Sequence, residues 1–288
     1  MLHFREEVYA YTGQTMVVDE LLFAGRSEYQ EILLFKNSFF GHVLVLDGIV
    51  QLSERDEFIY SEMLAHVPLF AHPNPRRVLI VGGGDGCVLK EVLKHAVEKV
   101  VLVDIDATVI DLCRRHFAAG NHRSFEDPRA EVLITDGIRY VRETPDRFDV
   151  ILVDGPDPIE PDAAGASLYT AEFYRLCAGK LNPGGMFLIQ SDVPFHNPDA
   201  MRLTYGALSS VFRNVQVYTV PVPCYLGGFM CFVLSSNDCM DASSPLHAGP
   251  VDAAIPGLGY YTREIHKAAI QLPPYIAALT AGAHAEVG

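Results

Sequence analysis

Four closely spaced glycines follow a run of apolar residues in the segment VLIVGGGDG. Gly82, Gly83, Gly84 and Gly86 would permit the tight turn that lets a ligand approach the backbone after a buried strand. A dinucleotide-binding loop of the G-x-G-x-x-G type would have its third glycine where this chain has Cys87, so the spacing disfavours NAD. The pattern predicts a nucleoside site, although a tight strand-to-helix turn without a ligand would use the same glycines.

Acidic residues follow the next two apolar runs. Asp104 ends VVLVD about 20 residues after the glycines, where a carboxylate can accept hydrogen bonds from both ribose hydroxyls. We expect the nearby Asp106 to cap the next helix. Asp136 and Gly137 follow the run AEVLIT, and the Asp136 carboxylate would either meet an adenine amine or cap a helix.

Three more carboxylates could form an acidic cleft. Asp85 lies within the glycine loop, Asp154 ends the run FDVILVD, and Asp157 follows in the loop DGPDPIEP. If the strands are neighbours in a parallel sheet, these carboxylates converge at one edge, where they repel one another unless a cation joins them. The group predicts a site for a positively charged small molecule, although each Asp alone is more often a cap or turn residue.

Alternating strands and helices would position these residues. After Pro75 the apolar runs are RRVLIV, KVVLVDI, AEVLIT, FDVILVD, GMFLIQ, VQVYTV and FMCFVL, separated mainly by helical segments. This alternation predicts an α/β domain with a methyltransferase-like Rossmann sheet, mostly parallel, whose last two strands form an antiparallel edge hairpin. We expect this nucleoside-binding catalytic domain to occupy residues 76–288, with a surface connection at 238–257.

The chain before this domain has a different pattern. Short β-rich runs between residues 14 and 52 predict a small antiparallel β domain over residues 1–53. Their turn signals are Gly25, Asn37, Gly41 and Asp47-Gly48. Helical spacing in ERDEFIYSEMLAHVPLF predicts a linking helix within residues 54–75 that stops before His72-Pro73. So small a β domain buries little surface alone, which favours a homodimer or homotetramer.

Composition limits the classes of partner. A formal net charge of -14, from 22 Lys and Arg against 36 Asp and Glu, disfavours nucleic acid and suits cationic small molecules, although solubility alone would account for it. The six cysteines include no C-x-x-C pair, which predicts no metal site or disulfide framework and a reducing compartment. With no signal peptide and no run long enough to span a bilayer, we expect a cytoplasmic protein without a membrane partner.

Taken together, these motifs resemble the spermidine synthase, or polyamine aminopropyltransferase, family. The resemblance covers nearly the whole chain and is carried by YQEILLF, VLVLDGIVQLSERDEFIYSEM, PNPRRVLIVGGGDG, FDVILVDGPDPIEP, LNPGG and YYTREIHKAAIQLPPY. It implies transfer of an aminopropyl group from decarboxylated S-adenosylmethionine, a co-substrate, to a small diamine. Putrescine would be the acceptor, spermidine and methylthioadenosine the products, and no prosthetic group would be needed.

The resemblance also implies roles for individual residues. Those contacting the methylthioadenosine portion would be Gln30, Asp104, Asp136, Gly137 and Pro161. Asp85 would hold the aminopropyl ammonium, and Asp154 would accept the proton of the amine. The residues that position the attacking amine would be Tyr60, Asp157 and Tyr225. Glu6 and Tyr11 fall near the place where the family holds the distal amine.

Three features depart from the family pattern. Ser61 stands where many bacterial members have histidine between Tyr60 and Glu62, Pro156 replaces a small polar residue, and the loop after Asp157 is a few residues longer. We expect Ser61 to border the acceptor channel and open space for an amine longer than putrescine. The alternative is that Ser61 points to solvent from the surface of its helix.

Two other functions fit this fold. One is an S-adenosylmethionine-dependent amine N-methyltransferase, such as the putrescine methyltransferases, which would differ in accepting a donor with a carboxylate. The other is a non-catalytic polyamine-binding protein, which a broken acidic cleft would favour. Asp85, Asp154 and Asp157 are all present, so the sequence favours an enzyme.

Overall fold

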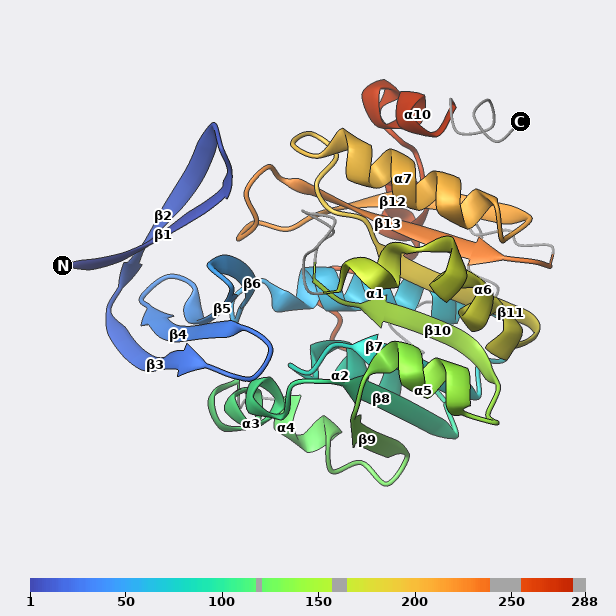
Figure 1. Cartoon of the computed structure of the whole chain (residues 1–288), viewed down its shortest axis with the longest axis horizontal. Coiled ribbons are helices and arrows are strands. Elements are labelled where there is room, and N and C mark those ends of the chain that lie inside the picture. The colour runs from blue at the N-terminus through green and yellow to red at the C-terminus, as the bar shows by residue number, and fades with distance from the viewer. Residues whose placement is uncertain (118–120, 157–164, 239–254, 282–288) are drawn as a thin grey trace.

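The computed structural model of this protein describes residues 1–117, 121–156, 165–238 and 255–281. These residues form three β-sheets. Two small antiparallel sheets come first along the chain, and a seven-stranded sheet covered by helices follows (Figure 1). Among the described residues, no helix is long and apolar enough to cross a membrane.

The small sheets confirm the predicted antiparallel N-terminal part. One pairs β1 (Leu2–Tyr9) with β2 (Thr12–Val18), so the charged start of the chain is also a strand. The other contains β3 (Glu20–Arg26), β4 (Glu31–Asn37), β5 (Gly41–Leu46) and β6 (Ile49–Ser53). Asp47 and Gly48 form the predicted turn between β5 and β6, with φ angles of 48° and 80°. The turn predicted at Gly25 was wrong, because this residue lies within β3 and pairs with Ile32.

Helix α1 (Glu57–Ala71) follows the small sheets and ends before His72-Pro73, as predicted. Every residue from Ser61 to Ala71 is buried, which is typical of a helix enclosed on all sides. The carboxylate of Glu62 accepts hydrogen bonds from the backbone N–H groups of Gly259, Tyr260 and Tyr261. A segment near the C-terminus therefore holds α1 in place.

The large sheet has the strand order β12-β13-β11-β10-β7-β8-β9. Its strands are β7 (Arg77–Gly82), β8 (Lys99–Asp104), β9 (Ala130–Ile134), β10 (Phe148–Asp154), β11 (Leu181–Gln190), β12 (Asn214–Pro221) and β13 (Phe229–Ser236). Neighbours from β11 to β9 run parallel, whereas β13 is antiparallel to both β11 and β12. The predicted mostly parallel sheet is confirmed, with β12 of the hairpin at the edge and β13 inside it.

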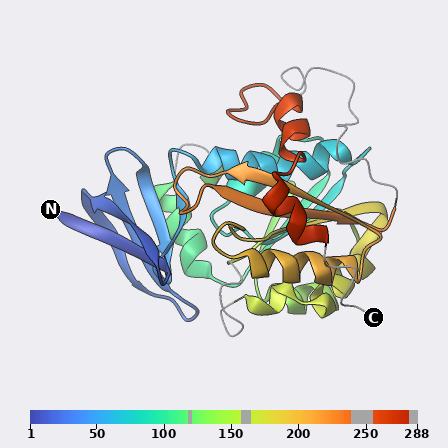
Figure 2. The same ribbon diagram turned by 90° about the horizontal axis from the view of Figure 1, so that it is seen from above.

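Helices cover both faces of the large sheet (Figure 2). They are α2 (Cys87–Leu93), α3 (Ala107–His116), α4 (Asn121–Ser124), α5 (Gly137–Glu143), α6 (Ala171–Lys180), α7 (Pro198–Ser209), α9 (Arg263–Ala269) and α10 (Pro274–Ala281), besides the 3₁₀ helix η1 (Ala166–Tyr169). Alternate residues of β7 pack on opposite sides: Ile80 joins the core with α1 and α2, and Leu79 joins the core with α5, α6 and α7. Burial on both faces accounts for the continuous apolar runs of the sequence.

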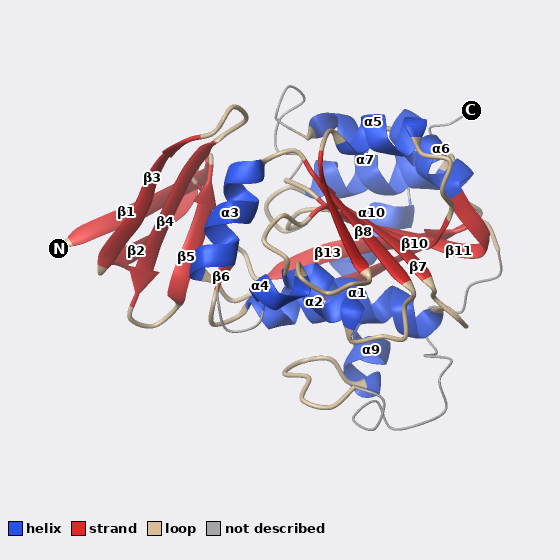
Figure 3. Ribbon diagram, turned by 90° about the horizontal axis from the view of Figure 1, so that it is seen from below, coloured by secondary structure: helices blue, strands red, loops and turns tan. Residues whose placement is uncertain are grey.

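The four-stranded sheet packs against the catalytic part through α3 (Figure 3). Ile32, Leu34 and Leu44 of this sheet share a buried cluster with Val109 and Leu112 of α3. This packing brings the N-terminal strands close to the carboxyl edge of the large sheet.

Candidate active site

A cavity of about 900 Å³ lies between the N-terminal strands and the carboxyl ends of β7, β8, β10 and β11. Ligands of open α/β sheets bind at this edge. Many carboxylates line the cavity, and Arg5, which pairs with Glu7, is the one cationic side chain among the described residues of its wall. This imbalance makes the cavity attractive to positively charged ligands.

The glycine loop connects β7 with α2 and forms part of the cavity wall. Gly82 has a φ of 83°, and a Cβ there would lie 2.0 Å from the backbone oxygen of Asp154. Side chains are thus excluded where the loop meets the end of β10. Gly82, Gly83 and Gly84 line the cavity, whereas Gly86 begins α2 against the ring of Phe125 and is not among the lining residues.

Asp104 ends β8 beside this loop. Its carboxylate accepts hydrogen bonds from the backbone N–H groups of Gly84 at 2.9 Å and Asp106 at 2.8 Å, which fix its orientation at the cavity. Burial raises the pKa of Asp104 to about 6, although these two hydrogen bonds oppose the increase. An acceptor held in this way suits a pair of ribose hydroxyls.

Asp106 caps α3 as predicted, accepting from the backbone N–H groups of Thr108 and Val109. Its second oxygen accepts hydrogen bonds from Ser27 at 2.6 Å and from the amide of Gln30 at 2.8 Å. Gln30 also lines the cavity, so the cap of α3 holds this side chain in the wall.

Asp136 and Gly137 line the cavity at the start of α5. Asp136 accepts a hydrogen bond from the backbone N–H of Arg139, which is the capping role that the sequence left open. The cap and a ligand contact are compatible, because a carboxylate has several acceptor sites.

The centre of the cavity contains Tyr60 and Asp154. The Tyr60 hydroxyl, from α1, donates a 2.8 Å hydrogen bond to Oδ1 of Asp154 at the end of β10. Burial, followed by the negative charge of Asp85, raises the pKa of Asp154 to about 8, while the hydrogen bond from Tyr60 lowers it in part. Burial and the charge of Asp154 also raise the pKa of Tyr60 well above its usual value. A cationic ligand would relieve the repulsion between these carboxylates.

The wall around this centre contains several further predicted residues. Asp85 lines it and accepts a hydrogen bond of 2.7 Å from the backbone N–H of Cys87. Tyr225 lies beside Tyr60, with ring centroids 6.2 Å apart, and donates to the backbone oxygen of Gln51. Ser61 lines the cavity and is 2% exposed, so the alternative that it points to solvent was wrong.

Two further buried carboxylates line the cavity. Glu6, from β1, accepts hydrogen bonds from the backbone N–H of Val50 and the amide of Gln14, and burial raises its pKa. Asp192, beyond the end of β11, accepts from the Tyr9 hydroxyl, and burial raises its pKa as well. Both line the cavity and are 2% exposed.

The sequence analysis missed Asp192. The signal was available, because Asp192 comes shortly after a predicted strand that ends at Gln190, and Asp104 and Asp154 end theirs. Its side chain is also one of the few buried charges of the protein, a feature that sequence alone does not reveal.

Two predicted residues, Asp157 and Pro161, lie outside the described residues. Tyr11 is described but is not among the residues that line the cavity. It lies beyond the end of β1, 71% exposed, with its hydroxyl 3.1 Å from Nδ1 of His196. The structure therefore places Glu6 at the cavity and Tyr11 outside it.

No cluster of three or more His, Cys, Asp or Glu side chains in the described part of the chain is arranged to hold a metal ion. The cysteines that the structure describes form no disulfide.

This chain is similar to known proteins over nearly its whole length. Residues 57–244 match the spermine/spermidine synthase domain, and residues 2–54 match the spermidine synthase tetramerisation domain. The polyamine aminopropyltransferase of Salmonella paratyphi B is 41% identical over 278 residues, covering 95% of this chain and 96% of the relative. That of Pectobacterium atrosepticum is 41% identical over 274 residues, covering 94% of each chain.

Solved structures agree with these matches. A spermidine synthase in complex with the transition-state analogue AdoDATO superimposes with a TM-score of 0.89 at 37% identity, covering 97% of this chain and 94% of the other. The spermidine synthase from Thermotoga maritima has a TM-score of 0.88 at 36% identity, with the same coverage.

Proposed function

Because the chain belongs to the spermine/spermidine synthase family and is a polyamine aminopropyltransferase, we propose that its donor is decarboxylated S-adenosylmethionine and its acceptor a small diamine, putrescine first. The observation that carries this proposal is the Tyr60–Asp154 hydrogen bond beside Asp85 in a cavity whose wall is strongly acidic. Such a cavity suits a donor with a sulfonium and an ammonium together with a cationic amine.

The donor would lie along the carboxyl edge of the large sheet. Asp104 would accept hydrogen bonds from the ribose hydroxyls, and Asp136, Gly137 and Gln30 would surround the base, together with Pro161. The sulfonium tail would then extend toward Asp85 and Asp154, whose charges attract its terminal ammonium.

The acceptor amine must lose a proton before it attacks. An alkylamine has a pKa of about 10.4 by analogy with lysine, so nearly all of it is protonated at neutral pH. Asp154 would accept this proton in its ionised form, and its pKa of about 8 makes it a stronger base than an ordinary carboxylate. Tyr60 would hold the Asp154 carboxylate, while Asp157 and Tyr225 would orient the nitrogen.

The reaction is then a single in-line displacement. The nitrogen lone pair forms a bond to the aminopropyl carbon attached to sulfur, the carbon–sulfur bond breaks, and its electron pair stays on the thioether of methylthioadenosine. The proton of the attacking amine goes to Asp154. Alignment of the two substrates supplies much of the rate enhancement.

Two further carboxylates of the wall would bind the second ammonium of the acceptor. Glu6 and Asp192 supply two buried carboxylates there. Their raised pKa values have the same cause as that of Asp154, the cost of burying a charge, and a bound ammonium would lower them.

The N-terminal strands would also join copies of this chain. The match of residues 2–54 to a tetramerisation domain supports an oligomer, and we propose a homodimer or homotetramer formed through these strands in the cytoplasm. Covering the edges of the small sheets would also protect them from unspecific pairing.

One assay tests the proposed substrates. Purified protein is incubated with decarboxylated S-adenosylmethionine or S-adenosylmethionine, each with putrescine, cadaverine, agmatine or spermidine, and products are identified by mass spectrometry. We expect aminopropylated amines and methylthioadenosine from the decarboxylated donor, with putrescine used best. Equal turnover of S-adenosylmethionine to methylated amine would contradict the proposal and favour an N-methyltransferase.

A further inference from the structure

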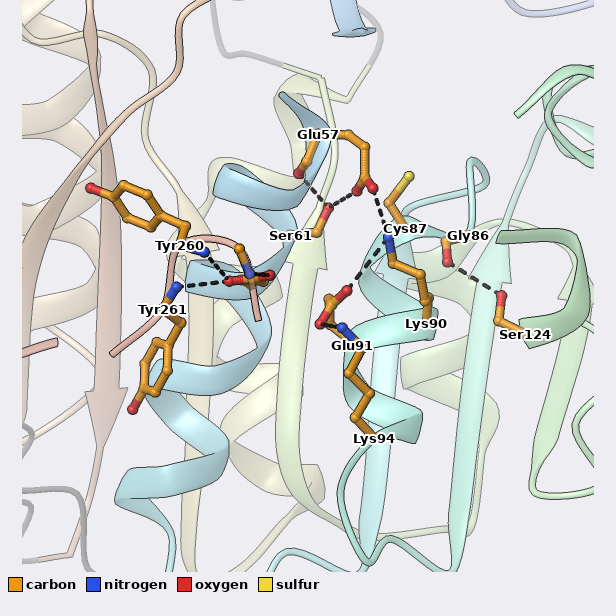
Figure 4. A network of polar contacts seen from close by, with 12 residues as sticks. Glu57, Ser61, Gly86, Cys87, Lys90, Glu91, Lys94, Ser124, Tyr260 and Tyr261 are labelled. Atoms are coloured by element: carbon orange, nitrogen blue, oxygen red, sulfur yellow. Dashed lines mark hydrogen bonds and ion pairs between the residues drawn. The ribbon is translucent and has the colours of Figure 1, made fainter. Parts of the chain in front are cut away.

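A charged cluster lies behind the cavity wall next to Tyr60. Glu57 and Ser61, both on α1, line the cavity, and Ser61 donates hydrogen bonds to the backbone oxygen of Glu57 at 2.9 Å and to its carboxylate at 3.2 Å (Figure 4). The other carboxylate oxygen of Glu57 lies 2.6 Å from Nζ of Lys90 on α2. Ser61 and Lys90 thus fix the Glu57 carboxylate from two sides.

Lys90 is bound on its far side as well. Its Nζ lies 3.5 Å from Oε1 of Glu91, a side chain that is 1% exposed. Oε2 of Glu91 contacts Lys94 at 2.5 Å (Figure 4) and lies 3.0 Å from Nε2 of His66. The two carboxylates Glu57 and Glu91 therefore pair with the two ammonium groups of Lys90 and Lys94.

Lys90 and Glu91 both stay ionised near neutral pH. Burial alone would lower the pKa of Lys90, but the attraction and hydrogen bond of Glu57, together with Cys87 and Glu91, raise that pKa above its usual value. Burial likewise opposes ionisation of Glu91, yet hydrogen bonds from His66 and Lys94 hold its pKa at about 2. Lys90 is therefore a full positive charge at any pH at which the enzyme works.

This charge lies close to the end of the cavity formed by Asp85. Burial raises the pKa of the Cys87 thiol, the nearby charges of Asp85 and Glu57 raise it further, and Lys90 lowers it in part. Cys87 lines the cavity beside Asp85, whereas Lys90 is not among the lining residues. The Lys90 ammonium is thus a near neighbour of the proposed aminopropyl site, and its ion pair directs it toward Glu57.

We propose that Glu57 is a specificity-determining residue for the donor: it holds the Lys90 ammonium out of the cavity, so that this cation does not bind the carboxylate of S-adenosylmethionine. This role rests on the donor proposed above, from which S-adenosylmethionine differs by one carboxylate on the carbon that bears its amine. Asp85 repels that carboxylate, and an unpaired Lys90 would attract it. Specificity between the two donors depends both on favourable contacts with the decarboxylated donor and on the absence of favourable contacts with the carboxylate of S-adenosylmethionine.

Equilibrium binding without an amine tests the role of Glu57. Calorimetry measures the affinity of the wild type and of Glu57→Gln for three ligands: decarboxylated S-adenosylmethionine, S-adenosylmethionine, and methylthioadenosine, which has neither tail charge. We expect Glu57→Gln to bind S-adenosylmethionine at least about 10-fold more tightly relative to methylthioadenosine than the wild type does, because Lys90 is released. Unchanged affinity for methylthioadenosine reports an intact fold.

Two further variants isolate Lys90. Lys90→Met in the Glu57→Gln background should return the affinity for S-adenosylmethionine, relative to that for methylthioadenosine, to the wild-type value. Lys94→Met is the matched control, since Lys94 pairs with the same Glu91 but not with Glu57, and it should leave this relative affinity unchanged. If Glu57→Gln does not fold, Lys90→Met alone decides, because an unpaired Glu57 should weaken S-adenosylmethionine binding relative to methylthioadenosine.

The outcomes separate this role from the proposed function. A wild type that binds both donors equally would overturn the proposed donor. If the wild type prefers the decarboxylated donor, two results would overturn the role of Glu57 alone. One is that Glu57→Gln leaves the affinity for S-adenosylmethionine relative to methylthioadenosine unchanged. The other is that the tighter binding of S-adenosylmethionine by Glu57→Gln persists when Lys90 is also replaced.

Discussion

The hydroxyl of Tyr60 and the carboxylate of Asp154 form a 2.8 Å hydrogen bond across 94 positions of the chain. Tyr60 reaches this contact from the second turn of α1, and Asp154 from the carboxyl end of β10. The contact joins the helix that follows the N-terminal sheets to the central strands of the large sheet, at the centre of the cavity.

Asp154→Asn should lower kcat by about 100-fold or more, because the amide cannot accept the proton of the attacking amine. The shape of the side chain is almost kept, and a buried neutral group replaces one with a raised pKa, so the fold should survive. Steady-state kinetics and thermal unfolding measure the two effects, with Asp111→Asn on the surface of α3 as the control. Retention of more than about half of kcat would leave Asp154 with a binding role at most.

Activity should rise with pH through about 8, the pKa to which burial and Asp85 raise Asp154. Only the ionised carboxylate accepts a proton, so kcat/KM for the donor, measured at amine concentrations well below the amine KM, should fall as pH decreases below that value. Tyr60→Phe removes the hydrogen bond that lowers this pKa, so its profile should move to higher pH. The titration of the amine is common to both enzymes, and coincident profiles would show that Asp154 does not set the pH dependence.

Asp192→Asn should raise KM for putrescine by about 10-fold or more while changing kcat little, because it removes a charge that would bind the distal ammonium and not the reacting amine. The KM for the donor should stay constant. Glu20→Gln, which removes a surface partner of Lys36, is the control for the loss of one carboxylate. A reduced kcat with an unchanged putrescine KM would place the second ammonium elsewhere.

Ser61→His should shift the ratio of kcat/KM toward putrescine over cadaverine, agmatine and spermidine by about 10-fold, because an imidazole fills space in the cavity wall. Ser61→Ala separates volume from hydrogen bonding, since it also removes the contact with Glu57 but leaves the space open. Steady-state kinetics with the four amines supplies the ratios. Equal ratios in all three enzymes would leave Ser61 without a role in acceptor choice.

The protein should form a dimer or tetramer in solution through its N-terminal strands. Leu21 on β3 is 50% exposed, and Leu21→Asp should weaken the assembly by placing a charge in an apolar contact. Leu203→Asp on α7, where the leucine is 73% exposed, is the matched control. Light scattering at micromolar concentration measures both, and a monomeric wild type would contradict the prediction.

The strands, the glycine loop and the helix caps were predictable because each depends on residues close together in the chain. Continuous apolar runs follow from burial of the large sheet on both faces, and the cap of α3 by Asp106 follows from the preference of a helix start for a short acidic side chain. Gly25 shows the limit of such reasoning, because pairing with β4 kept a turn-forming residue within a strand.

The sequence by itself determined which residues end the parallel strands, and hence that Asp85, Asp104 and Asp154 would be near one edge of the sheet. Only the tertiary structure decided which side chains meet there: Tyr60 with Asp154, Glu57 with Lys90, and Glu6 in the same cavity as Asp192. These contacts join segments far apart in the chain, and the packing of α1 and the N-terminal strands against the large sheet sets their geometry. The raised pKa values have the same origin, since they arise from burial that no single segment can create.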